Sequence, residues 1–167
     1  VAFALANACV IALYTIIDGS GARLAGNAWS YIAWLFVLDA LPFEKAALTE
    51  PCCVAYNGGC MNAHIRPGDS VVVIGPGPIG LLCTRMAALS GASTLVVVGL
   101  TADRPRLEAA RRLGATHTVD IETENLEEVV RDLCPIGADL VCDASGASST
   151  LEVALRLARP DGQVSKV

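Results

Sequence analysis

A run of β-branched residues that leads directly into three spaced glycines constrains the fold of this chain more than any other feature. Val71–Ile74 has the composition of a strand that is buried on both faces of a sheet. The strand is followed at once by Gly75-x-Gly77-x-x-Gly80, and an apolar helical pattern begins at Leu81. A strand, a glycine-rich turn and a helix in this order are typical of a phosphate-binding loop.

Each glycine of this loop has a distinct expected role. Gly75 permits a tight turn, Gly77 lets a pyrophosphate approach the backbone, and Gly80 lets the helix pack closely on the strand. Pro78 and Ile79 open the helix, whose free N–H groups and positive dipole favour phosphate. We therefore predict a dinucleotide site at these five residues; the alternative is a strand-turn-helix unit with no ligand.

Strand and helix patterns alternate along the rest of the chain. The predicted strands are 71–74, 95–98, 117–120, 138–143 and 162–167, and the predicted helices are 78–89, 105–113, 126–133 and 149–158. Such alternation predicts right-handed crossovers and an α/β fold with a doubly wound, Rossmann-like parallel sheet. We expect the strand order 3-2-1-4-5, with the glycine loop at the switch point between strands one and four.

Net charge and cysteine content indicate which kinds of partner and compartment to expect. The net charge is −5, which argues against nucleic acid as a partner. Seven cysteines are present without a Cys-x-x-Cys pair, so we expect reduced thiols that pack as small apolar groups in a cytoplasmic protein.

The first 41 residues differ in character from the rest. Two apolar runs, 1–17 and 28–38, flank a polar stretch, which predicts an apolar helical hairpin; each run falls short of the roughly 20 residues that span a bilayer. Tyr14-Thr-Ile-Ile-Asp18-Gly-Ser-Gly21-Ala-Arg23-Leu-Ala-Gly26 resembles a two-helix piece of the drug/metabolite transporter superfamily. That resemblance implies a membrane-derived segment and membrane association; the alternative is a pair of buried helices in a soluble fold. The predicted domains are therefore 1–41, a connecting segment 42–69, and the sheet domain 70–167.

A second resemblance covers residues from about 41 to the last residue. Ala46-Ala-Leu-Thr-Glu50-Pro51, Arg66-Pro-Gly-Asp-Ser70 and the glycine loop occur in the order found in medium-chain zinc-dependent dehydrogenases, and the sorbitol and threonine dehydrogenase branch is most similar. The resemblance implies hydride transfer between NAD(P) and a small alcohol or polyol, with zinc stabilising the alkoxide. It also implies that Glu50 lies beside the catalytic zinc; the alternative is a carboxylate that favours a helix start.

The end of the second strand bears on the choice of cofactor. NAD-binding folds usually carry Asp or Glu there, whereas this chain has Gly99. Thr101 and Arg104 could then bind a 2′-phosphate, which predicts NADP rather than NAD, although Asp103 could serve the ribose instead. We expect Arg104→Ala to weaken NADPH binding more than NADH binding.

Two further elements bear on the site. The resemblance implies that Ser145 and Gly146, in the turn after the fourth strand, line the cofactor groove; the alternative is a plain turn in which Ser148 or Ser149 caps the next helix. Cys60-x-x-x-His64 has helical spacing, but two ligands do not make a metal site.

The family's zinc-binding motifs do not occur in this sequence. The sequence has neither a Gly-His-Glu motif nor a run of four closely spaced cysteines, so we predict no metal site and no zinc in this chain. Because the family's sheet has a sixth strand, we also expect a truncated sheet, a weakly bound dinucleotide and no catalysis by this chain alone. The alternatives are a membrane-anchored nucleotide-binding or transporter fragment, and an artificial join near Leu41.

Overall fold

The structure, a computed structural model, describes residues 42–167. The chain divides into two compact units, Val1–Leu48 and Thr49–Val167. The described part of the first unit contains the short helix α3 (Phe43–Ala46), and all other described elements belong to the second unit. Residues 49–69 therefore belong to the same unit as the sheet. The predicted apolar hairpin at 1–41 lies outside the described residues.

The second unit is built on five parallel strands in the order β3-β2-β1-β4-β5, as predicted. These strands are β1 (Ser70–Ile74), β2 (Thr94–Gly99), β3 (His117–Asp120), β4 (Ala138–Asp143) and β5 (Ala158–Lys166). In the centre of the sheet, Val72 pairs with Val96 on one side and with Val141 on the other. The carboxyl ends of the strands therefore meet at one edge, and the chain reverses its direction of winding between β1 and β4.

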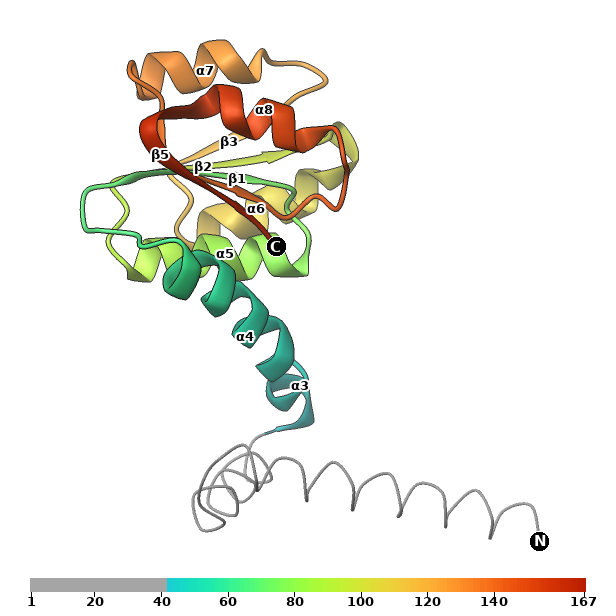
Figure 1. Cartoon of the computed structure of the whole chain (residues 1–167). Helices are drawn as coiled ribbons and strands as arrows, with labels where there is room; N and C mark the ends of the chain where they lie inside the picture. The colour runs from blue at the N-terminus through green and yellow to red at the C-terminus, as the bar shows by residue number, and fades with distance from the viewer. Residues whose placement is uncertain (1–41) are drawn as a thin grey trace, which may run out of the picture. The chain divides into compact units, whose positions relative to one another are not determined.

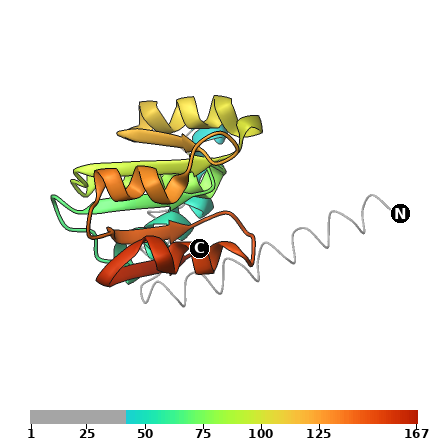
Figure 2. The ribbon, with the colours of Figure 1, turned by 90° about the horizontal axis from the view of Figure 1, so that it is seen from above.

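Helices cover both faces of this sheet (Figures 1 and 2). On one face lie α5 (Pro78–Leu89) and α6 (Arg104–Leu113), with α4 (Thr49–Tyr56) and the π-helix η1 (Asn57–Asn62) packed beside α5. The other face is covered by α7 (Leu126–Leu133) and α8 (Thr150–Leu157). Alternate residues of the strands enter the two cores: Val71 and Val73 face α5, and Val72 and Ile74 face α7 and α8.

Local sequence explains where several helices begin and end. The side chain of Asn125 accepts hydrogen bonds from the N–H groups of Glu127 and Glu128 at the start of α7. Gly114 ends α6 with φ of 119°, a backbone conformation that favours glycine. Ser149 stands at the N-cap of α8 but makes no capping hydrogen bond, so the proposed Ser149 cap is wrong. The hydroxyl of Thr150 instead donates to the Ala147 carbonyl at 2.8 Å.

Two elements differ from the predicted boundaries. The predicted connecting segment 42–69 contains α4 followed by η1, where the chain winds more widely at Gly58 and Gly59. Strand β5 begins at Ala158 rather than at residue 162, and its register with β4 shifts between Ala138 and Leu140. A positive φ of 60° at Asp161 accompanies this irregular start.

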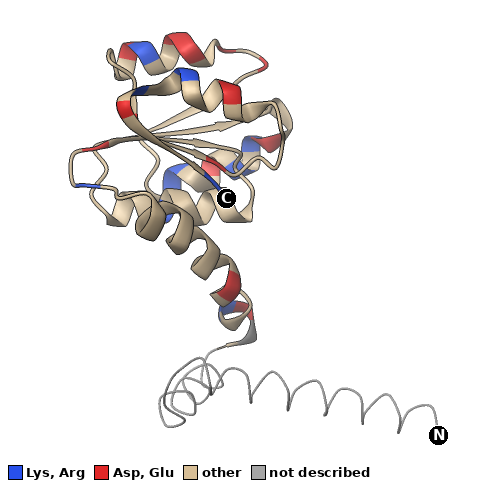
Figure 3. Cartoon of the chain, viewed as in Figure 1, with Lys and Arg blue, Asp and Glu red and all other residues tan. Residues whose placement is uncertain are grey.

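The charged residues lie mainly on the outer helices (Figure 3). Each of α6, α7 and α8 carries both signs, whereas Arg85 is the one charged residue of α5. The low charge of α5 fits its position, because the sheet covers one side of this helix and α4 covers another.

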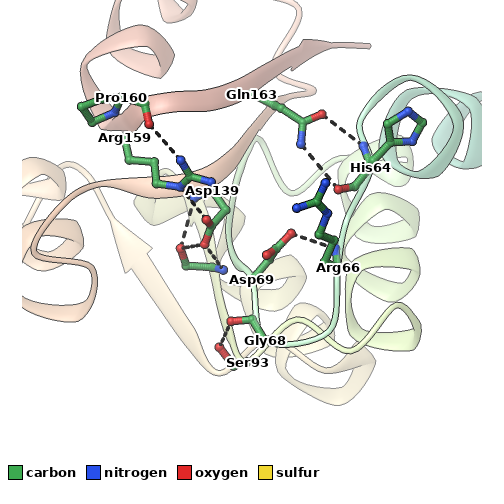
Figure 4. A network of polar contacts seen from close by, with 10 residues as sticks. His64, Arg66, Gly68, Asp69, Ser93, Asp139, Arg159, Pro160 and Gln163 are labelled. Atoms are coloured by element: carbon green, nitrogen blue, oxygen red, sulfur yellow. Dashed lines mark hydrogen bonds and ion pairs between the residues drawn. The ribbon is translucent and has the colours of Figure 1, made fainter.

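At the amino end of the strands, Asp139 connects three strands (Figure 4). Its carboxylate accepts hydrogen bonds from the N–H and hydroxyl of Ser70 at 2.8 and 2.7 Å. The guanidinium of Arg159 on β5 donates to the same carboxylate at 2.6 Å. Burial acts to raise the pKa of Asp139, but the bonds from Ser70 and Arg159 outweigh it and lower the pKa from 3.8 to about 2.

This network predicts a specific pH dependence of stability. Because the folded pKa of Asp139 is depressed, its contribution is present above about pH 4 and is lost as the pH falls towards about 2. We expect Asp139→Asn to lower the free energy of unfolding at neutral pH by about 1–2 kcal/mol and to flatten the loss between these pH values. Urea denaturation at several pH values measures both effects.

Asp132→Asn on α7 is the matched control, because Asp132 is exposed. It should change neither the neutral stability nor the acid profile. Equal acid profiles for Asp139→Asn and the unaltered chain would contradict this account of the network.

Candidate functional site

The carboxyl ends of the strands form the edge where the predicted site residues gather, and the glycine loop lies at its centre. Gly75 has φ of 97°, and its N–H donates to the Val98 carbonyl of β2 at 2.9 Å. A Cβ on Gly80 would collide with the Gly75 carbonyl oxygen, so the first turn of α5 lies directly against the loop backbone. These two glycines are therefore required by the fold itself, as the sequence predicted.

Gly77 is different, because nothing in the described part of the chain requires a glycine there. Its φ of −68° and ψ of 178° are open to any residue, and a Cβ placed on it would meet no atom within 4 Å. Gly77 is the N-cap of α5, with Pro78 and Ile79 in the first turn. The backbone is thus bare and accessible where the free N–H groups of α5 begin.

The end of β2 corrects the interpretation of Gly99. A Cβ at this position would lie 2.8 Å from Cγ of Pro76 and 3.2 Å from Cδ2 of Leu107. Position 99 therefore faces the glycine loop and α6, and a side chain there would require Pro76 or Leu107 to shift. Packing gives this glycine a reason that is independent of the cofactor.

Two carboxylates do lie beside the end of β2: Asp120 is the last residue of β3, and Glu122 lies in the turn that follows. Asp120 is the register partner of Gly99. The hydroxyl of Thr101, in the short helix η2 (Thr101–Asp103), donates to Oδ2 of Asp120 at 2.7 Å. The N–H of Thr101 donates to Oε2 of Glu122 at 2.8 Å. Sequence reasoning missed Asp120 and Glu122, because it looked for the acid on β2 alone.

Two other predicted residues follow Thr101. Asp103 accepts a hydrogen bond from Arg106 at 2.9 Å and one from the Leu100 N–H at 3.3 Å, so its carboxylate is used locally. Arg104 is exposed and lies in a groove of about 390 Å³ between α6 and the end of β3. Three carboxylates, from Glu108, Asp120 and Glu124, line the same groove.

Exposed apolar side chains flank the same end. Leu100 follows β2 and Ile121 follows β3, and these residues are 45% and 46% exposed. Their place beyond the carboxyl ends of adjacent strands makes them suitable for a flat apolar group such as a base. Sequence reasoning did not single them out, although a large apolar residue just after each buried strand was a usable signal.

At the end of β4, a buried carboxylate organises the turn that contains Ser145 and Gly146. The side chain of Asp143 is fully buried and accepts hydrogen bonds from the hydroxyls of Ser145 and Thr150 at 2.6 and 2.7 Å. Lys166 at the end of β5 donates to the same carboxylate at 2.8 Å and to the Ala147 carbonyl at 2.9 Å. Burial acts to raise the pKa of Asp143, but Lys166 and the two hydroxyls lower it from 3.8 to about 2.

The hydroxyl of Ser145 is therefore used within the protein. Gly146, with φ of 73°, would meet no atom within 4 Å on adding a Cβ, so its surface faces open space. What this turn offers to a ligand at the carboxyl edge of the sheet is therefore mainly its backbone.

Three buried cysteines of the second unit serve packing, whereas Cys53 on α4 is exposed. Cys83 on α5 and Cys142 on β4 lie together in one core, and Cys134 is buried in the other core with residues of α7 and α8. The neighbouring Cys83 thiol and burial raise the pKa of Cys142 above its ordinary value. These thiols therefore behave as the small apolar groups that the sequence predicted.

The remaining candidates do not come together as a metal site. Glu50 lies in the first turn of α4 and is exposed. Cys60 faces Ser90, with Sγ and Oγ 3.8 Å apart, and the backbone of His64 pairs with Gln163 of β5. Among residues 42–167, no group of three or more His, Cys, Asp or Glu side chains could hold a metal ion.

Comparison with known proteins identifies the family. The model of the family described as zinc-binding dehydrogenase matches residues 78–167, which is more than half of the sequence. The chain belongs to the zinc-binding dehydrogenase family. Residues 78–167 run from the start of α5 through β5.

Several members of this family resemble the chain in sequence. It is 40% identical over 133 residues to the uncharacterized zinc-type alcohol dehydrogenase-like protein YdjL of Escherichia coli, covering 77% of this chain and 37% of that protein. It is 37% identical over 130 residues to D-arabitol-phosphate dehydrogenase of Enterococcus avium, with the same two coverages. The chain thus spans little more than a third of the length of these relatives.

Solved structures of dehydrogenases share the fold. Alcohol dehydrogenase TADH from Thermus sp. ATN1 superposes with a TM-score of 0.64 at 42% identity, over 70% of this chain and 33% of that one. A zinc-binding dehydrogenase from Sinorhizobium meliloti, bound to NADP, gives 0.61 at 33% identity, over 71% and 35%. These relatives are dehydrogenases, and they give no support to a transporter-like origin for residues 1–41. No helix in the described part of the chain is both long and apolar enough to cross a membrane.

The Asp143 network leads to a second stability prediction. Lys166→Met removes the one cation that the buried Asp143 carboxylate contacts in the described structure. We expect the free energy of unfolding at neutral pH to fall by about 1–2 kcal/mol. The pKa of Asp143 should rise from about 2, so that acid destabilisation begins at a higher pH. Denaturation curves and NMR titration of the carboxyl carbon measure the two effects.

Arg85→Met on α5 is the control, since Arg85 is exposed. It removes the same charge and should leave both quantities unchanged. An unaltered Asp143 pKa in Lys166→Met would show that the ammonium does not determine the ionisation of this carboxylate.

Proposed function

We propose that this chain supplies the NAD(P)-binding part of a zinc-type dehydrogenase that acts on alcohols or polyols. The observation that carries the proposal is the bare backbone at Gly77, where neither conformation nor packing requires a glycine. A glycine that the protein does not need for itself, at the N-terminus of α5, suits the close approach of a pyrophosphate. The family and its alcohol and polyol dehydrogenases support the same activity.

The arrangement of the edge suggests how the cofactor would lie. The pyrophosphate would occupy the switch point at Gly77, with N–H donors and the dipole of α5 directed at it. The adenosine half would extend over Leu100 and Ile121, beyond β2 and β3. The nicotinamide half would extend towards Ser145 and Gly146 at the end of β4.

A contrast between two glycines tests the dinucleotide site. We expect Gly77→Ala to leave the melting temperature unchanged but to weaken NAD(P)H binding by at least about tenfold, because the added methyl occupies the space of the phosphate. Gly80→Ala should instead destabilise the fold by about 2 kcal/mol or more, since its methyl collides with Gly75. Calorimetric titration and thermal unfolding separate these effects.

Gly68→Ala is a poor control because its φ is 95°, whereas Gly59→Ala is matched, since its added Cβ also meets nothing within 4 Å. Gly59 is buried in η1, far along the chain from the glycine loop, and Gly59→Ala should leave NAD(P)H binding unchanged. If Gly77→Ala binds cofactor as tightly as the unaltered chain, the proposed site is wrong.

The catalytic zinc of this family does not fit the described residues. Glu50, Cys60 and His64 are the candidates nearest to a ligand set, and they do not form a cluster. What residues 42–167 supply is therefore cofactor binding and orientation: N–H donors for the pyrophosphate and backbone surface for the nicotinamide half. Polarisation of the alcohol oxygen is chemistry that zinc would supply when bound.

We accordingly expect this chain to bind NAD(P)H without turning over substrate. Hydride transfer requires donor and acceptor to be held in contact while developing charge is stabilised. Incubation with sorbitol, arabitol and secondary alcohols and either cofactor, followed at the absorbance of the reduced nicotinamide, should give no turnover above the Gly77→Ala variant. Turnover with stoichiometric zinc would contradict this expectation.

A further inference from the structure

We propose that Asp120 and Glu122 make this site select NAD over NADP. The inference rests on the proposed function and specifies the cofactor of that site. It replaces the expectation drawn from Gly99, whose position faces Pro76 and Leu107 rather than the ribose end of the edge.

Asp120 lies where the ribose of a bound dinucleotide would be expected. Parallel pairing puts Asp120 on β3 directly beside Gly99 on β2. A ribose that lies across the end of β2 would therefore meet a carboxylate from the neighbouring strand. Acidic groups at this end of a dinucleotide fold accept hydrogen bonds from the 2′-hydroxyl, and they repel a phosphate in its place.

The hydrogen-bond donors of Thr101 are not available to a phosphate. A 2′-phosphate needs donors, and Thr101 offers two, its N–H and its hydroxyl. The hydroxyl already donates to Asp120 at 2.7 Å, and the N–H already donates to Glu122 at 2.8 Å. With both donors engaged, Thr101 retains only the acceptor capacity of its hydroxyl oxygen, which suits a ribose hydroxyl and not an unprotonated phosphate.

The two carboxylates are themselves held in place. The N–H of Glu122 donates to Oδ1 of Asp120 at 3.1 Å, and the N–H of Asp120 donates to Glu124 at 3.0 Å. Reorienting Thr101 towards a phosphate would break both of its bonds and would bring a dianion close to two negative charges.

The cations nearby do not reverse this balance. Arg106 is paired with Asp103 at 2.9 Å. Arg104 shares its groove with Arg111 and with the carboxylates of Glu108, Asp120 and Glu124. Arg111 already donates to the Thr118 hydroxyl at 2.7 Å, and three carboxylates outnumber the two guanidinium groups. Arg104 therefore lies in surroundings that already contain an excess of negative charge.

The test compares the dissociation constants of NADH and NADPH for the full chain and three variants. The unaltered chain should bind NADH at least about tenfold more tightly than NADPH. Asp120→Asn combined with Glu122→Gln removes both charges and keeps the side-chain sizes. It should shift the ratio of the two dissociation constants towards NADPH by at least about tenfold, because NADPH loses a repulsion while NADH loses a carboxylate acceptor for its ribose. Glu128→Gln removes an exposed charge on α7 and should change neither the NADH nor the NADPH dissociation constant.

Arg104→Ala tests whether this arginine binds a 2′-phosphate. Arg104→Ala should leave the ratio of the two dissociation constants within about threefold of its original value. A selective loss of NADPH binding in Arg104→Ala, or equal affinities in the unaltered chain, would overturn the selection of NAD but would leave the dinucleotide site intact. Failure of both cofactors to bind any form of the chain would overturn the proposed function itself, and the inference with it.

Discussion

The close contact between the first turn of α5 and the backbone of Gly75 determines much of this structure. Only a residue without a Cβ fits at Gly80, because the Gly75 carbonyl fills that space. This contact fixes the direction in which α5 leaves β1, and with it the face of the sheet on which α5 and α6 pack. The free N–H groups at the start of α5 are directed at the opening between β1 and β4 for the same reason.

The two edges of the sheet use charge in different ways. At the amino edge, Asp139 on β4 bonds to Ser70 on β1, which is 69 positions away, and to Arg159 on β5. At the carboxyl edge, Asp143 and Lys166 pin a turn, and Asp120 and Glu122 bind the donors of Thr101. The first network contributes stability alone, whereas the second set of contacts also shapes a surface that a ligand can use.

Most of the fold could be predicted from the sequence because buried parallel strands leave a strong local signal. Runs such as Val71–Ile74 and Leu95–Val98 are apolar on both faces, and the glycine loop marks the switch point between the two halves. The irregular start of β5 could not be predicted, since Ala158–Asp161 contains Pro160 and two charged residues, and only pairing with β4 makes it a strand.

The candidate site was predictable only in part, for a related reason. Gly75, Gly77 and Gly80 have roles that follow from their spacing along the chain. The surroundings of Thr101 depend instead on the register between β2 and β3, which no local pattern specifies. Likewise, the pairing of Asp143 with Lys166 joins residues 23 positions apart, and the direction of position 99 is set by the packing of Pro76.

The buried carboxylate of Asp143 has a consequence for the thermodynamics of ligand binding. With Ser145, Thr150 and Lys166 all bonded to it, the turn after β4 is already ordered when the protein folds. The backbone of this turn therefore loses its conformational entropy during folding. A ligand that contacts Gly146 then binds without a further loss of that entropy. Binding to this part of the edge should accordingly show a small entropic penalty, since the protein is preorganised on the side that would face the nicotinamide.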